Sequence, residues 1–230
     1  MKSMKLSLEG SLGKLRTTYV DIFYLHWWDF STSVEEIMDG LHCLVTQGKA
    51  LYLRVSNAPA FRVAQCNQYA QDHGKLQFVI YQGEWNVLKR DVEGEILPLC
   101  RAEGMAFAPW NMLCVGKLRT DTKEEREKTG QAGRQGLTST WKRNEMERKV
   151  SGILEKIGKE VGVNDIRAVA IAYHLQKQPH VFPLIGGNKI KYMMSNINAL
   201  KVTLKQEHIK EIESAAPFDI GFPHNYLVSV

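Results

Sequence analysis

The amino-acid sequence predicts an α/β fold in which parallel β-strands alternate with α-helices. Short apolar runs rich in β-branched and aromatic residues have the composition of strands buried on both faces. Amphipathic stretches separate these runs, and the first four start about 27 to 31 residues apart, which is the repeat of parallel β–α–β units. Polar residues gather where the runs end. This pattern is typical of a barrel or of a doubly wound sheet.

Five apolar runs are the strand candidates. In chain order they are "YVDIFYLHW", "ALYLRVSN", "QFVIYQGEW", "MAFAPWNML" and "HVFPLIGG", which start at Tyr19, Ala50, Gln77, Met105 and His180. They are continuous apolar segments more than strict polar–apolar alternations. We therefore expect each run to be covered on both faces, as strands of a parallel sheet are.

The stretches between the strand candidates carry helix signals. The segment 33–49 begins with Ser33 as an N-cap, has acidic residues in its first turn and runs out at Gly48. The other helix candidates are 4–16, 58–75, 91–104, 146–162, 163–178, 189–200 and 203–215. Residues 119–143 are instead charged, dotted with glycine and largely aperiodic. Such a loop is either a disordered insertion or a cover over a bound cofactor, and both interpretations stay open.

Composition limits the classes of function. The 230 residues, 44% of them apolar, suffice for one sizeable core, and we expect a single domain over residues 1–230. The net charge of +5 comes from bases interleaved with acids, so we expect no nucleic-acid partner. No apolar run approaches the roughly 20 residues of a membrane span, which argues against a membrane partner. The N-terminal residues lack the apolar core of a secretory signal, so a cytoplasmic location is the expectation.

The four cysteines indicate free thiols. Cys43, Cys66, Cys100 and Cys114 are scattered without CxxC spacing. This arrangement suits reduced cytosolic thiols better than disulfides or a metal site, and we expect no metal centre.

The carboxyl ends of parallel strands form the functional edge of an α/β fold. The first strand candidate ends in His26 and Trp27, the second ends in Ser56 and Asn57, and the third carries Gln82. One hydroxyl and two amides are groups that can form hydrogen bonds with a carboxamide. A histidine among apolar residues is by itself more often a core or rim side chain than a catalyst.

The fourth and fifth strand candidates add an aromatic face and a glycine-rich turn. Trp110 offers a surface on which a flat ring can stack. Gly186 and Gly187, followed by Asn188 and Lys189, precede a helix, where backbone N–H groups and a cation can bind a phosphate. Each feature is common in turns and caps, but the combination suits a nicotinamide dinucleotide.

Six motifs, in order along nearly the whole chain, resemble the aldo-keto reductase superfamily. They are "YVDIFYLHWWD", "VSNAPA", "YQGEWNVL", "MAFAPWN", "FPLIGGNKI" and "PFDIGFP". The resemblance is greatest to the fungal aryl-alcohol dehydrogenase branch, which also holds reductases of natural-product pathways. The family's fold is an eight-stranded α/β barrel that binds NADPH across the ends of the strands.

The resemblance implies roles for individual residues. It matches His26 to the catalytic-site histidine that orients a substrate carbonyl. It also implies an NADP(H)-binding set. In this set Ser56, Asn57 and Gln82 hold the carboxamide, and Trp110 stacks on the nicotinamide ring. The adenosine 2′-phosphate is bound by Gly186, Gly187, Asn188 and Lys189, and adenine is contacted by Asn196.

The implied activity is NADPH-dependent reduction of a ketone or aldehyde, so the expected partner is a small-molecule carbonyl or alcohol. A pocket walled by Trp27, Trp28 and Trp85 would favour an aryl or polycyclic substrate, in keeping with fungal secondary metabolism. Either of the first two tryptophans could equally serve packing.

The sequence also departs from the family pattern. The family's catalytic Asp, Tyr and Lys come from strands that precede this chain's first strand. The expected fold is therefore a partial TIM-type (β/α) barrel with about the last five of eight parallel strands plus C-terminal helices. Five strands cannot close such a barrel, so open sheet edges could support self-association.

Two substitutions weaken the expected cofactor site. Arg54 stands where the family has a Gly before "VSN", and "CVGK" at 114–117 replaces a glycine-rich run that approaches the pyrophosphate. We expect reduced affinity for NADPH. The alternatives to an active enzyme are a catalytically dead truncated paralogue that acts as a binding or interaction protein, and a fragment produced by a gene-model error.

Overall fold

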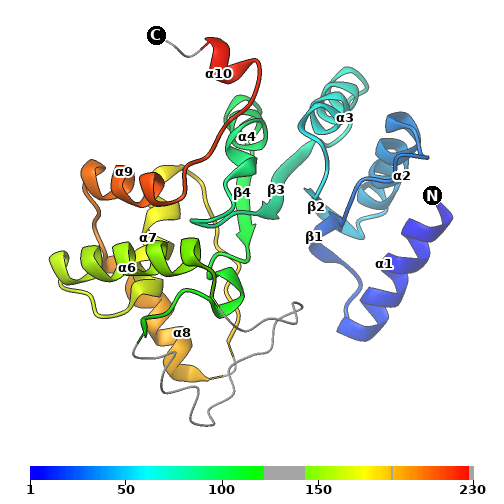
Figure 1. Ribbon diagram of the computed structural model, residues 1–230. Helices are drawn as coiled ribbons and strands as arrows, with labels where there is room; N and C mark the ends of the chain where they lie inside the picture. The colour runs from blue at the N-terminus through cyan, green and yellow to red at the C-terminus, as the bar shows by residue number, and fades with distance from the viewer. Residues whose placement is uncertain (122–142, 188, 228–230) are drawn as a thin grey trace. The chain divides into compact units, whose positions relative to one another are not determined.

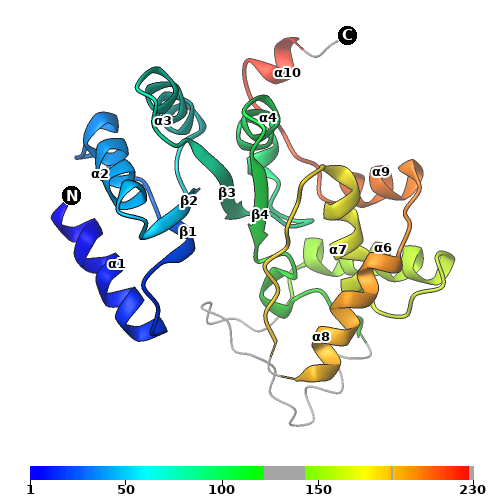
Figure 2. The ribbon, with the colours of Figure 1, turned by 180° about the vertical axis from the view of Figure 1, so that it is seen from behind.

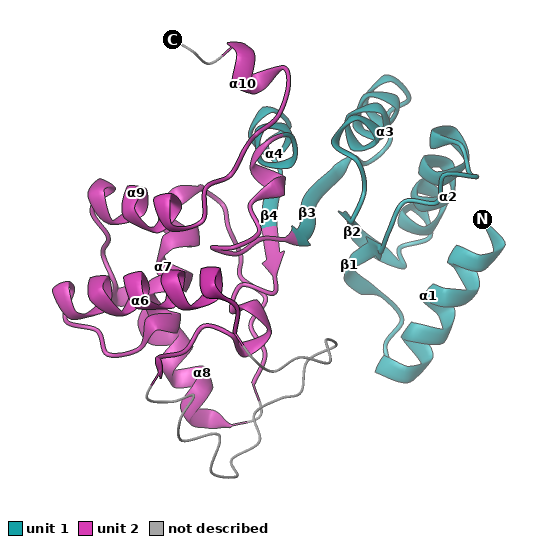
Figure 3. Ribbon diagram, in the orientation of Figure 1, with its two compact units in different colours: residues 1–83, 95–107 teal, residues 84–94, 108–230 magenta. Residues whose placement is uncertain are grey.

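The computed structural model describes residues 1–121, 143–187 and 189–227. The chain forms two compact units (Figure 3). Unit 1 comprises residues 1–83 and 95–107, and unit 2 comprises residues 84–94 and 108–230. Most of the segment 119–143 lies outside the described residues, so its role as a cofactor cover stays a prediction. The expectation of a single domain over the whole chain also stays a prediction.

Within the described residues, four β-strands form one sheet in the order β1-β2-β3-β4 (Figure 1). The strands are β1 (Val20–Leu25), β2 (Ala50–Ser56), β3 (Phe78–Glu84) and β4 (Ala106–Trp110). β1 pairs in parallel with β2, and β2 pairs in parallel with β3. All four strands fall within the first four predicted runs. The predicted α/β class is confirmed.

The helices of unit 1 lie along one side of its strands (Figures 1 and 2). They are α1 (Lys2–Leu15), α2 (Val34–Thr46), α3 (Ala60–Asp72) and α4 (Ile96–Ala102). Ser33 caps α2 as predicted, because its hydroxyl accepts a hydrogen bond from the Glu36 N–H at 3.2 Å. Leu53 is buried on one face of β2, whereas Tyr52, on the opposite face, is 56% exposed. From Leu53 to Ser56, however, both faces of β2 are buried, so the expected burial on both faces is found along this part of the strand.

Unit 2 is built mainly from helices. They are the short 3₁₀ turns η1 (Asp91–Glu93), η2 (Cys114–Gly116) and η3 (Asn198–Lys201) and the helices α6 (Glu145–Glu160), α7 (Ile166–Lys177), α8 (Ile190–Ile197), α9 (Gln206–Ala215) and α10 (His224–Leu227). A capping box starts α6, in which Asn144 and Glu147 each accept a backbone hydrogen bond from the other at 2.8 Å. The core of unit 2 includes Leu154 of α6, Val169 of α7 and Ile212 of α9.

The predicted fifth strand, residues 180–187, is an extended segment and not a regular strand. It makes one bridge, at Val181, and the Leu184 N–H donates a hydrogen bond to the Pro109 carbonyl of β4 at 3.0 Å. Pro183 lacks an N–H group and cannot donate to a ladder, and His180 has a left-handed φ of 56°. Both features interrupt strand geometry. The segment nevertheless lies beside β4. The sequence predicted a strand at these residues and did not predict its neighbour.

Two further expectations concern free thiols and membrane-spanning helices. All four cysteines are free thiols, and burial raises the pKa of Cys66, Cys100 and Cys114 to about 12. No helix among the described residues combines the length and the apolar character needed to traverse a lipid bilayer.

A partly buried cluster of charges holds residues 84–94 against α7 in unit 2. The Glu93 carboxylate accepts hydrogen bonds from Arg90 Nε at 2.9 Å, Arg90 Nη2 at 2.8 Å and Trp85 Nε1 at 3.0 Å. Lys177 of α7 adds an ion pair to Glu93 at 2.8 Å. Burial alone would raise the pKa of Glu93, but these hydrogen bonds outweigh it and lower the pKa.

We expect the substitution Glu93→Ala to destabilise the protein by about 2 kcal/mol, because it removes the partly buried carboxylate that Arg90 and Lys177 share and leaves them, among the described residues, only Glu213. Urea unfolding followed by circular dichroism measures this change. Glu155→Ala is the control, since Glu155 pairs with Lys159 at the solvent-exposed surface of α6, and its effect should be small. Equal effects of the two substitutions would contradict the role of the cluster.

Candidate functional site

The carboxyl ends of the three strands of unit 1 bring four of the predicted residues together. His26 follows β1, Ser56 ends β2, and Gln82 lies opposite Ser56 on β3. Asn57 connects all three strands, because its Nδ2 donates to the His26 carbonyl at 3.4 Å and its backbone N–H donates to the Gln82 carbonyl at 3.3 Å. Asn57 has a left-handed φ of 49°, a conformation that asparagine tolerates better than most residues.

His26 is exposed, with an aromatic surface beside it. Its imidazole stacks on the indole of Trp27, with ring centroids 5.0 Å apart and planes inclined by 22°. Trp27 is itself 64% exposed, so this pair of rings can meet a ligand. Trp28 is buried, and the Arg62 guanidinium lies 6.0 Å from the centre of its ring.

The expectation that Trp85 walls the pocket is wrong. Trp85 is fully buried in unit 2, where its ring meets the edge of His174 at a centroid distance of 4.6 Å. Its indole N–H is satisfied by Glu93. It therefore belongs to the core, which the sequence could not reveal because a strand-end tryptophan suits either environment.

Ser56 is the most deeply buried of the four residues in unit 1. It is 1% exposed, and its hydroxyl has no hydrogen-bond partner among the described residues. Arg54 precedes it by two residues and so lies on the same face of β2. The long cation that the sequence predicted beside the carboxamide set is therefore present there.

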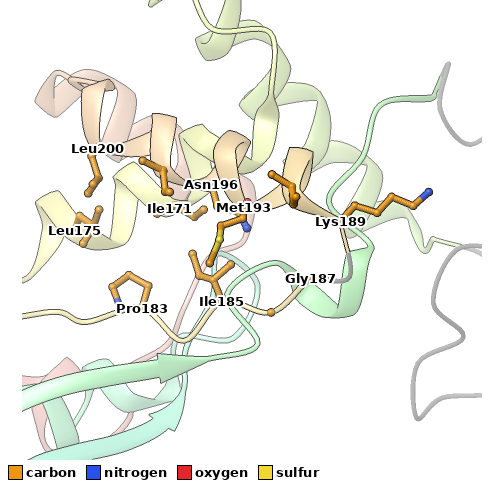
Figure 4. A pocket seen from close by; sticks show the side chains of 12 residues that line it. Ile171, Leu175, Pro183, Ile185, Gly187, Lys189, Met193, Asn196 and Leu200 are labelled. Atoms are coloured by element: carbon orange, nitrogen blue, oxygen red, sulfur yellow. The ribbon is translucent and has the colours of Figure 1, made fainter.

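Unit 2 contains a pocket of about 650 Å³ between α7, α8 and residues 183–187 (Figure 4). Most of its lining is aliphatic. The lining residues are Ile171, Leu175, Pro183, Ile185, Gly186, Gly187, Lys189, Ile190, Met193, Asn196, Ile197 and Leu200. Four of the predicted cofactor residues are thus found together here. In Figure 4 the Lys189 side chain extends away from the aliphatic side chains of the pocket.

Asn196 supplies a buried polar group of this pocket. It is 8% exposed, and its Oδ1 has no hydrogen-bond partner among the described residues. Trp110, at the end of β4, is 36% exposed and directly follows Pro109, the residue that pairs with Leu184. Asn188 lies outside the described residues.

The Asp165 carboxylate holds α8 in place, and no sequence pattern indicated this role. Asp165 caps α7 by accepting a hydrogen bond from the Arg167 N–H at 3.1 Å, and Ser195 of α8 donates its hydroxyl to the same carboxylate. The Arg167 guanidinium pairs with Asp165 and lies 5.3 Å from the centre of the Tyr192 ring of α8. The local signal was the N-cap aspartate, but its contact with α8 has no local signature.

Comparison with known proteins identifies relatives over almost the whole chain. A family model described as the aldo/keto reductase family matches residues 2–217. An aryl-alcohol dehydrogenase [NADP(+)] of Phanerodontia chrysosporium is 52% identical over 226 residues, which cover 97% of this chain and 59% of that protein. Norsolorinic acid reductase B of Dothistroma septosporum is 48% identical over 227 residues, covering 98% of this chain and 56% of that protein. The chain thus spans less than two thirds of either relative.

A solved structure agrees with the predicted fold. The crystal structure of a thermostable aldo-keto reductase in complex with the inhibitor epalrestat matches with a TM-score of 0.73 at 23% identity, covering 93% of this chain and 66% of that chain. At this identity the likeness concerns the fold alone. It supports the predicted partial TIM-type barrel.

The Asp165 carboxylate should make stability depend on pH. Burial would raise its pKa, but the hydrogen bonds from Arg167 and Ser195 lower it to about 2, below its ordinary value of 3.8. A lowered folded-state pKa stabilises the protein above about pH 4, and this stabilisation is lost as the pH falls toward 2. We therefore expect Asp165→Asn to cost about 2 kcal/mol at pH 6 and about half as much at pH 3.

Urea unfolding of the wild type and of Asp165→Asn at these two pH values measures the difference. Asp72→Asn, at the exposed end of α3, is the control and should show no such change with pH. A constant difference between wild type and Asp165→Asn would exclude the ionised carboxylate as the cause.

Proposed function

The chain belongs to the aldo/keto reductase family, and on this premise we propose that it reduces an aldehyde or ketone to an alcohol with NADPH as cofactor. The observation that carries the proposal is the convergence of His26, Ser56, Asn57 and Gln82 at the carboxyl ends of three adjacent parallel strands. This is the edge at which α/β folds place their chemistry.

His26 is the residue proposed to meet the substrate. Reduction of a carbonyl builds negative charge on its oxygen, and a positioned N–H donor stabilises that charge. The imidazole is exposed and can donate a hydrogen bond to the oxygen. The Trp27 ring stacked beside it supplies an apolar surface for an aromatic substrate.

The groups on β2 and β3 fit a carboxamide. The Ser56 hydroxyl is buried with unused hydrogen-bonding capacity, which a carboxamide N–H or C=O could satisfy. Asn57 and Gln82 add amide groups at the same edge. A reduced nicotinamide, when bound, supplies the hydride for the reduction. The exposed Trp110 ring, which belongs to unit 2, stays a predicted stacking surface for a flat ring.

The pocket of unit 2 fits the adenosine end of the cofactor. Asn196 Oδ1 is a buried acceptor that has no hydrogen-bond partner where the structure describes the chain, and it suits the exocyclic amine of adenine. Gly186 has open space where a side chain would begin, so a phosphate can approach its backbone. Lys189 is proposed to pair with the 2′-phosphate, and Asn188 belongs to the same proposed loop.

The names of the relatives suggest the substrate class. An aryl-alcohol dehydrogenase acts on aryl alcohols by its name, and norsolorinic acid reductase is a related protein of another fungus. For this chain we propose an aryl or polycyclic carbonyl of fungal secondary metabolism. A binding protein without turnover is the second candidate, favoured by the Arg54 cation on the strand that carries Ser56.

We expect the purified chain to oxidise NADPH in the presence of an aromatic aldehyde, and His26→Ala to slow this turnover by about a hundredfold. The decay of NADPH fluorescence measures the rate. His73→Ala, which alters a histidine at the end of α3, is the matched control and should leave the rate unchanged. Unchanged turnover in His26→Ala would contradict the role of His26. NADPH binding without turnover in the wild type would favour the second candidate.

We expect NADPH to bind with a dissociation constant weaker than micromolar, because Arg54 and the "CVGK" segment depart from the family pattern. Fluorescence titration measures this affinity, and micromolar or tighter binding would refute the expectation.

Lys189→Ala should weaken NADPH binding about tenfold and leave NADH binding unchanged, because only NADPH carries the 2′-phosphate. Lys201→Ala in η3 is the control, and equal losses for both nucleotides would contradict the role of Lys189.

A further inference from the structure

Arg54 is a buried cation, and two of its side-chain nitrogens are without protein partners in the described part of the chain. The residue is 6% exposed, and its Nε and Nη2 atoms have no hydrogen-bond partner among the described residues. Burial lowers the pKa of Arg54 to about 10, so the guanidinium stays charged at neutral pH. A buried charge without a counter-charge is costly, which makes the position a candidate for an anionic ligand.

The surroundings of Arg54 are aromatic and aliphatic. In the parallel register Tyr24 of β1 and Ile80 of β3 lie opposite Arg54. The guanidinium carbon is 4.1 Å from the centre of the Tyr24 ring, which leaves the in-plane N–H donors free of this contact. Ser56 and Gln82 form the next row of side chains on the same face, toward the carboxyl ends of the strands. Arg54 therefore lies one row below the proposed carboxamide site.

Another arginine of the chain shows what the same donors do when a carboxylate is present. In unit 2, Arg90 Nε donates to Glu93 Oε1 at 2.9 Å, and Arg90 Nη2 donates to Glu93 Oε2 at 2.8 Å. This two-point fork is the geometry that arginine offers to carboxylates. In Arg54 the same two nitrogens, Nε and Nη2, are buried and have no hydrogen-bond partner among the described residues.

We propose that Arg54 binds the carboxylate of the substrate, so that the chain selects an aromatic aldehyde or ketone that also bears a carboxylate group. This inference rests on the proposed reductase function only in taking the ligand to be a substrate. The Arg54 fork holds the carboxylate by two hydrogen bonds, and the aromatic part of the substrate packs against Tyr24. Nε and Nη2 are shielded from water in the free chain, so the proposed binding requires the arginine side chain to turn outward.

Calorimetric titration with benzoate and with benzamide, its neutral counterpart of similar shape, tests the proposal without cofactor or turnover. Benzoate should bind the wild type at least about tenfold more tightly than benzamide. Arg54→Met, which keeps most of the side-chain volume, should remove this preference. Arg54→Lys, which keeps the charge but loses the fork, should retain only part of it.

The matched control is Arg62→Met, since Arg62 is an arginine of unit 1 that also lies over an aromatic ring, at 5.0 Å from the centre of Phe61. This substitution should leave the preference for benzoate intact. Equal binding of benzoate and benzamide by the wild type would overturn the proposal whether or not any variant folds. A preference that survives in Arg54→Met, or that is lost in Arg62→Met, would overturn it as well.

A titration of Arg54→Met with NADPH separates a substrate carboxylate from a cofactor phosphate. We expect this variant to bind NADPH as tightly as the wild type or more tightly. Weaker NADPH binding together with unchanged benzoate binding would assign Arg54 to a phosphate and overturn the carboxylate proposal. Because the benzoate measurements need no hydride transfer, a chain without turnover would contradict the reductase proposal and leave the test of Arg54 intact.

Discussion

The proposed site depends on the parallel register of β1, β2 and β3. Parallel pairing sends the carboxyl ends of all three strands to one edge of the sheet, so side chains from separate strand–helix units meet there. Asn57 then joins the ends, because its left-handed backbone directs its N–H to Gln82 while its side chain reaches the His26 carbonyl. Without this register, His26, Ser56 and Gln82 would be three unrelated polar residues. The register thus connects strand pairing directly to the proposed chemistry.

Unit 2 relies on buried charges in addition to its apolar core. Glu93 gathers two cations and an indole N–H around one carboxylate, and Asp165 joins the start of α7 to Ser195 of α8. Such groups are strongly coupled to their partners, because a buried charge that loses its counter-charge destabilises the fold. The position of α8 matters for function, since this helix carries Asn196 into the pocket proposed for adenosine. The same electrostatics therefore support both the stability of the unit and the shape of the pocket.

Arg54 is the counterexample to this pattern. The partly buried carboxylates of Glu93 and Asp165 have cationic partners, whereas the Nε and Nη2 atoms of Arg54 have no hydrogen-bond partner among the described residues. Its position on β2, on the same face as Ser56, places the cation next to the proposed carboxamide site. By the proposal, this departure from the family pattern selects the substrates that the chain accepts.

The sequence by itself determined the strands, the helices and the identity of the strand-end residues, because these depend on local patterns. Apolar runs predicted the four strands, and Ser33 predicted the start of α2 through its capping hydrogen bond. Only the tertiary structure decided that residues 180–187 run beside β4 without forming a ladder and that Trp85 is buried. It also decided that Nε and Nη2 of Arg54 have no hydrogen-bond partner among the described residues. Burial and pairing depend on residues that are distant in the chain. A local sequence pattern does not indicate which of these distant groups will surround a side chain.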